Sequence, residues 1–104
     1  MITQPNSQRP LFKIGTYQFP PEQIVLLAGD RNYTKAILLD GSVWLSSKTL
    51  SVYEAEALAL GFIRAHKSFI INKIHIKKIT NNYVLLDHYL APIPLSRRRR
   101  SKFK

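Results

Sequence analysis

The sequence predicts an all-β domain with one short helix, built from short antiparallel sheets packed in layers. Three observations indicate this class. Short apolar runs of strand length recur along the chain, turn-forming residues separate them at intervals typical of a sandwich or open barrel, and apolar residues recur at helical spacing in one segment. Because strands and helices do not alternate, a parallel sheet is not expected. The pattern predicts about eight or nine strands.

The size and composition of the chain predict a single domain over residues 11–104. The chain has 104 residues and is 45% hydrophobic, which is enough for one compact core. Residues 1–10 carry two prolines and mostly polar side chains, so we expect a flexible N-terminal arm there. No apolar run approaches the roughly 20 residues of a membrane helix, and cysteine is absent. These features predict a cytoplasmic protein.

The N-terminal half is predicted to form four strands joined by turns. An alternating stretch begins at Leu11, and Pro20-Pro21 ends it because proline has no N–H to donate. The polar segment 28–32 separates two apolar runs and predicts a turn. Asp40-Gly41 predicts a hairpin with a type I′ turn, since both residues tolerate a positive φ. The expected strands are one from residue 11 to the prolines, then 24–27, 33–39 and 42–46.

One helix is predicted over about residues 50–60. Thr49 stands at the N-cap, and Gly61 stands where a helix C-cap is common. Ser51 and Glu54 also have the spacing of a capping box, so a start one or two residues later is an alternative. The apolar positions at helical spacing are Leu50, Tyr53, Ala57 and Leu58.

The C-terminal half returns to strands. Residues 62–72 form a long β-prone stretch, and 76–80 is expected to pair with 83–86 across Asn81-Asn82. Residues 90–95 contain two prolines, which predicts an edge strand. The apolar positions expected in the core include Ile37, Leu39, Trp44, Phe69 and Ile71.

Nothing in the sequence favours an enzyme, a cofactor or a metal site. No motif brings two carboxylates together for acid–base chemistry, the three histidines lack a metal-ligand spacing, and the four glycines are scattered singly. The acidic residues, which fall mainly at turns or on the helix, are Glu22, Asp30, Asp40, Glu54, Glu56 and Asp87.

The positive charge indicates a polyanionic partner. Sixteen Lys and Arg against six Asp and Glu give a formal net charge of +10. The last eight residues, 97–104, are RRRRSKFK and hold six of those cations, so the charge is concentrated at one end. A solvated basic tail that only aids solubility is the structural alternative. Composition alone does not separate nucleic acid from an anionic membrane.

Cationic and hydrogen-bonding residues also fall at three predicted breaks, where loops can enter a DNA groove that a flat sheet cannot. Arginine is well shaped to bind guanine bidentately, and a lysine such as Lys67 can bind guanine or a phosphate. The alternative, purely structural interpretations are a solvated loop lysine for Lys67, a half-buried strand aromatic for Tyr33 and a surface charge for Arg97. The breaks hold Arg31, Asn32 and Lys35, then His66, Lys67 and Ser68, then Arg97 onward.

Four motifs in order resemble the LytTR family of bacterial DNA-binding domains. They read DRNYTK at 30–35, DG at 40–41, FIRAHKSFIIN at 62–72 and IPLSRR at 93–98. The third and fourth blocks are far more specific than any single short motif, and the resemblance extends from about Gln23 to Lys104. It implies a LytTR-like β sandwich with a basic C-terminal turn or helix, and transcription regulation as the output domain of a response regulator.

The resemblance also implies sequence-specific binding of double-stranded DNA through loops that enter successive major grooves and bend the site. Carried over by motif, the base contacts are Tyr33, Lys67 and Arg97. Other members carry different polar residues at the first two positions, so the base preference does not carry over. The expected contacts to the DNA backbone are Arg31, Asn32, Lys35, His66, Ser68, Arg98, Arg99, Arg100, Lys102 and Lys104.

The same resemblance suggests partners. LytTR domains usually follow a receiver domain or a membrane segment, so we expect a stand-alone member or an excised domain. Repeated promoter half-sites and a sensor kinase or receiver protein of the same pathway are the expected partners. Two other classes stay open: an RNA-binding β module, and an adaptor that docks on acidic protein or anionic membrane.

Overall fold

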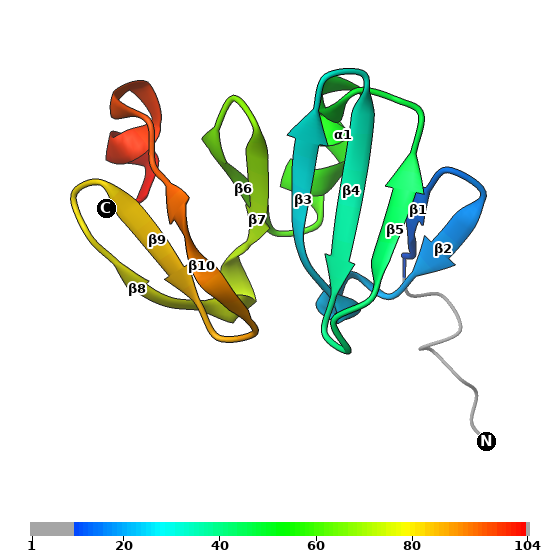
Figure 1. The fold of residues 1–104 in the computed structure, drawn as a ribbon, viewed down its shortest axis with the longest axis horizontal. Helices are drawn as coiled ribbons and strands as arrows, with labels where there is room; N and C mark the ends of the chain where they lie inside the picture. Colours follow the sequence, from blue (N-terminus) through cyan, green and yellow to red (C-terminus); the bar gives the residue numbers. More distant parts are fainter. Residues whose placement is uncertain (1–9, 104) are drawn as a thin grey trace.

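The computed structural model describes residues 10–103 and places about half of them in short antiparallel strands (Figure 1). One α-helix, α1 (Leu50–Ala59), lies in the described part of the chain, so the predicted all-β class with one short helix is confirmed. The strands are β1 Phe12–Ile14, β2 Tyr17–Phe19, β3 Ile24–Asp30, β4 Tyr33–Leu38, β5 Val43–Ser46, β6 Phe62–His66, β7 Phe69–Asn72, β8 Ile76–Ile79, β9 Tyr83–Leu86 and β10 Tyr89–Pro94. Short 3-10 helices are Pro21–Gln23, Lys73–His75 and η4, Arg97–Phe103.

A central sheet of five strands organises the molecule. Its order is β5-β4-β3-β7-β6, and every neighbouring pair is antiparallel. Successive side chains of a strand point to opposite faces, so both faces of β3 and β7 carry apolar residues. The sheet is therefore covered on both sides and separates two core clusters.

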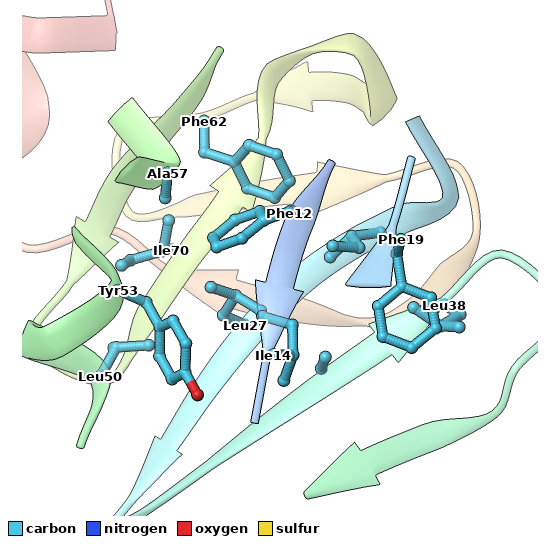
Figure 2. Close-up of a cluster of buried hydrophobic side chains, with 12 residues drawn as sticks. Phe12, Ile14, Phe19, Leu27, Leu38, Leu50, Tyr53, Ala57, Phe62 and Ile70 are labelled. Atoms are coloured by element: carbon cyan, nitrogen blue, oxygen red, sulfur yellow. The ribbon is translucent and has the colours of Figure 1, made fainter. Parts of the chain in front are cut away.

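The first core cluster lies between the central sheet, α1 and the hairpin β1–β2 (Figure 2). Phe12 is fully buried, and its ring centroid lies 5.4 Å from that of Phe62 and 6.2 Å from that of Tyr53, both edge-on. The amide of Gly15 donates to the Tyr53 hydroxyl at 3.0 Å. The short N-terminal hairpin is thus attached to α1 by packing and by a hydrogen bond.

The second core cluster fills the opposite side of the central sheet, beneath a three-stranded sheet of order β10-β9-β8. Leu26 and Ile71 of the central sheet, with Val84 and Ile93 of the smaller sheet, are buried there. Phe103, at the end of η4, packs against this cluster. β10 is an edge strand, as its prolines predict.

Three turns differ from the sequence-based expectation. The first strand is interrupted at Gly15, whose φ of 61° lets the chain reverse into the β1–β2 hairpin, so a single strand up to the prolines was wrong. β3 continues to Asp30, which shortens the expected turn at 28–32 to Arg31-Asn32. Partnering by β4 and β7 keeps residues 28–30 extended despite their turn propensity.

The hairpin at Asp40-Gly41 is present, but its turn is not type I′. Gly41 has a φ of 86°, whereas Asp40 is not among the described residues with a positive φ. The Asp40 carboxylate instead accepts hydrogen bonds from the Ser42 hydroxyl at 2.6 Å and the Ser42 amide at 2.9 Å, which lower the pKa of that carboxyl. These side-chain bonds add to the backbone hydrogen bonds that close the turn, from Gly41 N–H to the Leu38 carbonyl and from Leu38 N–H to the Ser42 carbonyl.

The helix ends are close to those predicted, but the cap chemistry is different. Thr49 is the N-cap residue, yet its side chain makes no capping hydrogen bond. Gly61 follows the helix with a φ of 96°, as a C-terminal glycine should. Glu54 does not form the alternative capping box, because its carboxylate pairs with Arg64 of β6.

Most of the positions expected in the core pack there, with one exception. Ile71 is fully buried, Ile37 and Phe69 pack against the second cluster, and Trp44 packs against the first. Leu39 is 39% exposed, so its assignment to the core was wrong. It lies in the widened turn after β4, beyond the ladder that would have covered it.

The predicted arm at residues 1–10 lies outside the described residues except for Pro10, which is exposed. Among helices of the described chain, none has the length and apolar character needed to cross a membrane.

Candidate nucleic-acid interface

The three segments that the sequence singled out lie along one edge of the molecule. The β3–β4 turn, the β6–β7 turn and η4 all stand at the upper edge in Figure 1. Backbone hydrogen bonds connect them in that order. Gly29 N–H, near the end of β3, donates to Ser68 of the second turn at 2.8 Å, and Ser96 N–H, just before η4, donates to Ala65 of β6 at 2.9 Å.

The β3–β4 turn presents its polar side chains to solvent. Arg31 and Asn32 are exposed, and Tyr33, the first residue of β4, is 53% exposed. Arg31 has a φ of 59°, a left-handed conformation that a two-residue hairpin turn demands and that asparagine or glycine adopts more readily. Lys35 lies within 3.9 Å of Asp30, and both side chains are largely exposed. That pair contributes little stability and leaves the Lys35 ammonium accessible.

The β6–β7 turn consists of Lys67 and Ser68, and Lys67 is exposed. His66, just before it, is partly buried, and its Nδ1 accepts a hydrogen bond from the Ser68 amide at 3.1 Å. Burial, followed by the nearby cations Lys67, Arg99 and Arg64, lowers the pKa of His66 below its ordinary value. His66 is therefore neutral at pH 7 and serves as an acceptor that shapes the turn.

Arg64 is the one residue of this region whose role the sequence did not reveal. Its side chain is 11% exposed, and its guanidinium donates to the backbone oxygens of His66 and Lys67 and to the carboxylate of Glu54. In the sequence, Arg64 stood out only as a member of the motif FIRAHKSFIIN at 62–72. The available signal was a cation between the apolar residues of a strand, which requires a buried partner.

The C-terminal segment η4 divides its cations between solvent and the protein. Arg97, Arg98 and Lys102 are exposed, whereas Arg99 and Arg100 are partly buried. Phe103 anchors the end of the segment in the second core cluster, and the amide of Arg99 donates to Ser96 at 3.1 Å. The basic end is thus a packed helix over the described residues and not only a solvated tail. Lys104 lies outside the described residues.

Within residues 10–103, no acidic side chain forms an ion pair with the exposed arginines. Ion pairs in the described part of the chain are Lys35 with Asp30 and Arg64 with Glu54, and neither involves η4. The Nε of Arg100 and the hydroxyl of Ser96 are buried without a hydrogen-bond partner within residues 10–103. Uncompensated cations on one edge produce a field that attracts an anion.

Among the residues described, no three His, Asp or Glu side chains form a group that would hold a metal ion. His75 and His88 meet edge-on with ring centroids 5.4 Å apart, but the Nε2 of buried His75 is hydrogen-bonded to the Glu22 carbonyl at 2.8 Å. His75 therefore joins two segments of the fold.

Acidification is expected to destabilise the wild-type domain more than a His66→Gln variant. The folded-state pKa of His66 lies below its unfolded value of about 6.5, so as the pH falls the unfolded chain takes up the proton first. The contribution of His66 to stability is fully present above about pH 6.5 and is lost as the pH falls through that value towards the folded pKa. Urea unfolding of both proteins at about pH 7.5 and about pH 5 measures the difference. Because His75 and His88 remain in both proteins, an equal loss in the two would exclude His66 as its source.

Comparison with known proteins gives a consistent picture. The sequence model of the LytTr DNA-binding domain family matches residues 15–104. Among solved structures, the chain is similar to the LytTr DNA-binding domain of a putative methyl-accepting/DNA response regulator from Bacillus cereus, with a TM-score of 0.68 and 25% sequence identity over 90% of this chain and 91% of that chain. The search of curated proteins gave no match.

Proposed function

The chain belongs to the LytTR family of DNA-binding domains, and from that membership we propose that it recognises specific sites in double-stranded DNA by inserting loops into the major groove. DNA binding and transcription regulation are the general function of the family, which is not a catalytic one. The proposal adds the manner of binding and the residues that carry it.

The observation that carries the proposal is that the β3–β4 turn, the β6–β7 turn and η4 share one edge of the molecule. The molecule measures 48 Å along its longest axis, and this axis is horizontal in Figure 1, parallel to the edge that holds them. One turn of B-DNA advances about 34 Å, so a molecule of this length can lie along more than one helical turn, and three segments at different places on one edge would meet different parts of the duplex. A protein with Lys67 and Arg97 on opposite sides would not have this option.

We assign base contacts to Tyr33, Lys67 and Arg97, one from each loop. All three are exposed, and no side-chain hydrogen bond or ion pair occupies them within the described residues. Arg97 is suited to guanine O6 and N7, and Lys67 to guanine or a phosphate. The assigned backbone contacts are Arg31, Asn32, Lys35, His66, Ser68, Arg98, Arg99, Arg100, Lys102 and Lys104.

The exposed members of that group, such as Arg98 and Lys102, are best placed to meet phosphates directly. His66 and Ser68 are partly buried and bonded to each other, so they would contribute mainly by holding the turn in its conformation. The protein would act on repeated half-sites in bacterial promoters, in the cytoplasm, in a pathway with a sensor kinase or receiver protein.

The salt dependence of DNA binding is expected to be steep. With about six to eight phosphate contacts, log K should fall with log salt at a slope of about −5 to −7. The double variant Arg98→Gln with Lys102→Gln should flatten that slope by about two, because each phosphate contact contributes roughly 0.9. Fluorescence anisotropy between low and moderate salt measures both slopes. Substitution is preferable to deletion of residues 99–104, since deletion would also remove Phe103 from the second core cluster.

The same assay separates the proposed function from its alternatives. A site selected from a randomised duplex pool should bind more tightly than random duplex, single strands or RNA at one salt concentration. Preference for RNA or single strands would favour an RNA-binding module. Binding to anionic vesicles in a flotation assay without duplex discrimination would favour a membrane adaptor. An unchanged slope in the double variant would remove both cations from phosphate binding.

A further inference from the structure

We propose that Arg64 is a positioning residue for DNA recognition: it holds the β6–β7 turn so that Lys67 faces the duplex, without contacting DNA itself. The inference rests on the proposed function and identifies a residue on which the β6–β7 turn depends. Arg64 lies in β6, before the turn, and Lys67 is the exposed residue at the tip.

The guanidinium of Arg64 connects two elements. Its Nε donates to the His66 carbonyl at 3.1 Å and its Nη2 donates to the Lys67 carbonyl, both in the turn. Its Nη1 donates to the carboxylate of Glu54 on α1. The carbonyls of His66 and Lys67 belong to the two peptide groups that flank the Cα of Lys67, and both accept from one rigid planar group, so the direction of the Lys67 side chain is tied to the position of α1.

Arg64 is not available to DNA. Its side chain is 11% exposed, and three of its nitrogens are already bonded to protein acceptors. Removing a guanidinium from these acceptors to reach a phosphate would leave the Glu54 carboxylate, which is 35% exposed, without its partner.

A shift in strand register makes the same place sensitive. The ladder between β6 and β7 slips between Arg64 and His66, which leaves Ala65 without a partner on β7. The free carbonyl of Ala65 accepts the Ser96 amide at 2.9 Å, one residue before Arg97. Register shifts of this kind re-aim side chains. Arg64 therefore borders a backbone hydrogen bond that connects β6, just before the β6–β7 turn, to the residue that precedes η4.

Lysine is the informative substitution because it keeps the charge but offers one nitrogen in place of the planar fork. It is able to retain the ion pair with Glu54 while losing at least one turn carbonyl. We expect Arg64→Lys to weaken binding to the selected duplex by about tenfold, the loss that follows from displacing one base contact, and to leave random duplex within about twofold. Thermal unfolding should show that the variant is folded.

The decisive measurement is a double-mutant cycle between Arg64→Lys and Lys67→Ala on the selected and random duplexes. If Arg64 acts through Lys67, the lysine substitution has no further effect on discrimination once Lys67 is alanine. Independent, multiplicative losses would overturn the proposal, and so would an equal loss on both duplexes. If Arg64→Lys fails to fold, Glu54→Gln takes its place in the cycle, because it loosens the guanidinium from α1 and leaves both turn carbonyls bonded. We expect this variant to lose less discrimination between the duplexes, and that loss should vanish in the Lys67→Ala background. A loss that persists there would overturn the proposal.

A matched control is Lys77→Ala, an exposed cation on β8 in the other sheet, which should change neither discrimination nor the cycle. The outcomes also keep the two proposals distinct. Wild-type protein that does not discriminate between duplexes contradicts the proposed function, whereas discrimination lost in Lys67→Ala but independent of Arg64 contradicts only the positioning role.

Discussion

Replacing Arg97 by alanine will weaken binding to a selected duplex by about 5- to 150-fold and will change binding to random duplex far less. The range follows from the roughly 1–3 kcal/mol that one bidentate base contact contributes. Arg97 is exposed at the start of η4, directly after Ser96, whose amide fixes the chain to β6. Because the backbone is already fixed there, DNA binding does not have to order this part of the main chain, although the exposed Arg97 side chain still loses its rotamer freedom.

Lys67→Ala should show the same pattern with a smaller loss, because a single ammonium makes fewer directed hydrogen bonds than a guanidinium. Fluorescence anisotropy with matched competitor DNA measures both variants. Arg98→Ala is the control, since Arg98 is exposed beside Arg97 and is assigned to the phosphates. It should weaken the selected and random duplexes alike. If Arg97→Ala behaves like this control, Arg97 does not read bases.

Much of the fold could be predicted from the sequence because its signals are local. The hairpins at 40–41 and 81–82 depend on turn residues a few positions apart, and α1 depends on the spacing of its own apolar residues. The three loops were found in the same way, as polar breaks between apolar runs. That they meet at one edge follows from the strand order β5-β4-β3-β7-β6, in which β3 and β7 become neighbours although the helix separates them in sequence.

The features that the sequence did not reveal are those decided by distant partners. β3 stays extended through Gly29 because Ser68 accepts its amide across the sheet, although glycine and aspartate there favour a turn. The role of Arg64 depends on Glu54 of another element. The basic composition of residues 97–104 gave no sign of a core contact, yet Phe103 packs against the second core cluster. In each case tertiary contact outweighs local propensity.

Replacing Phe12 by alanine is expected to destabilise the domain by about 3–5 kcal/mol, the cost of removing a buried aromatic side chain and leaving a cavity. Phe12 is fully buried against Phe62 and Tyr53 (Figure 2), yet it precedes residue 15, where the match to the family begins. Urea unfolding measures the free energy of unfolding, and Leu11→Ala, at a neighbouring position that is 45% exposed, is the control with an expected change below about 1 kcal/mol.

A small effect of Phe12→Ala would mean that the β1–β2 hairpin is an appendage and that the folding unit begins near residue 15. The packing favours the opposite result. The hairpin covers the end of the first core cluster, and the Gly15 amide bonds the Tyr53 hydroxyl of α1. Because Glu54, the next residue of that helix, pairs with Arg64, a hairpin that loosens would release α1 and, through it, the turn that carries Lys67. A Phe12→Ala protein that is still folded at low temperature should therefore lose discrimination between duplexes before it loses affinity for random DNA.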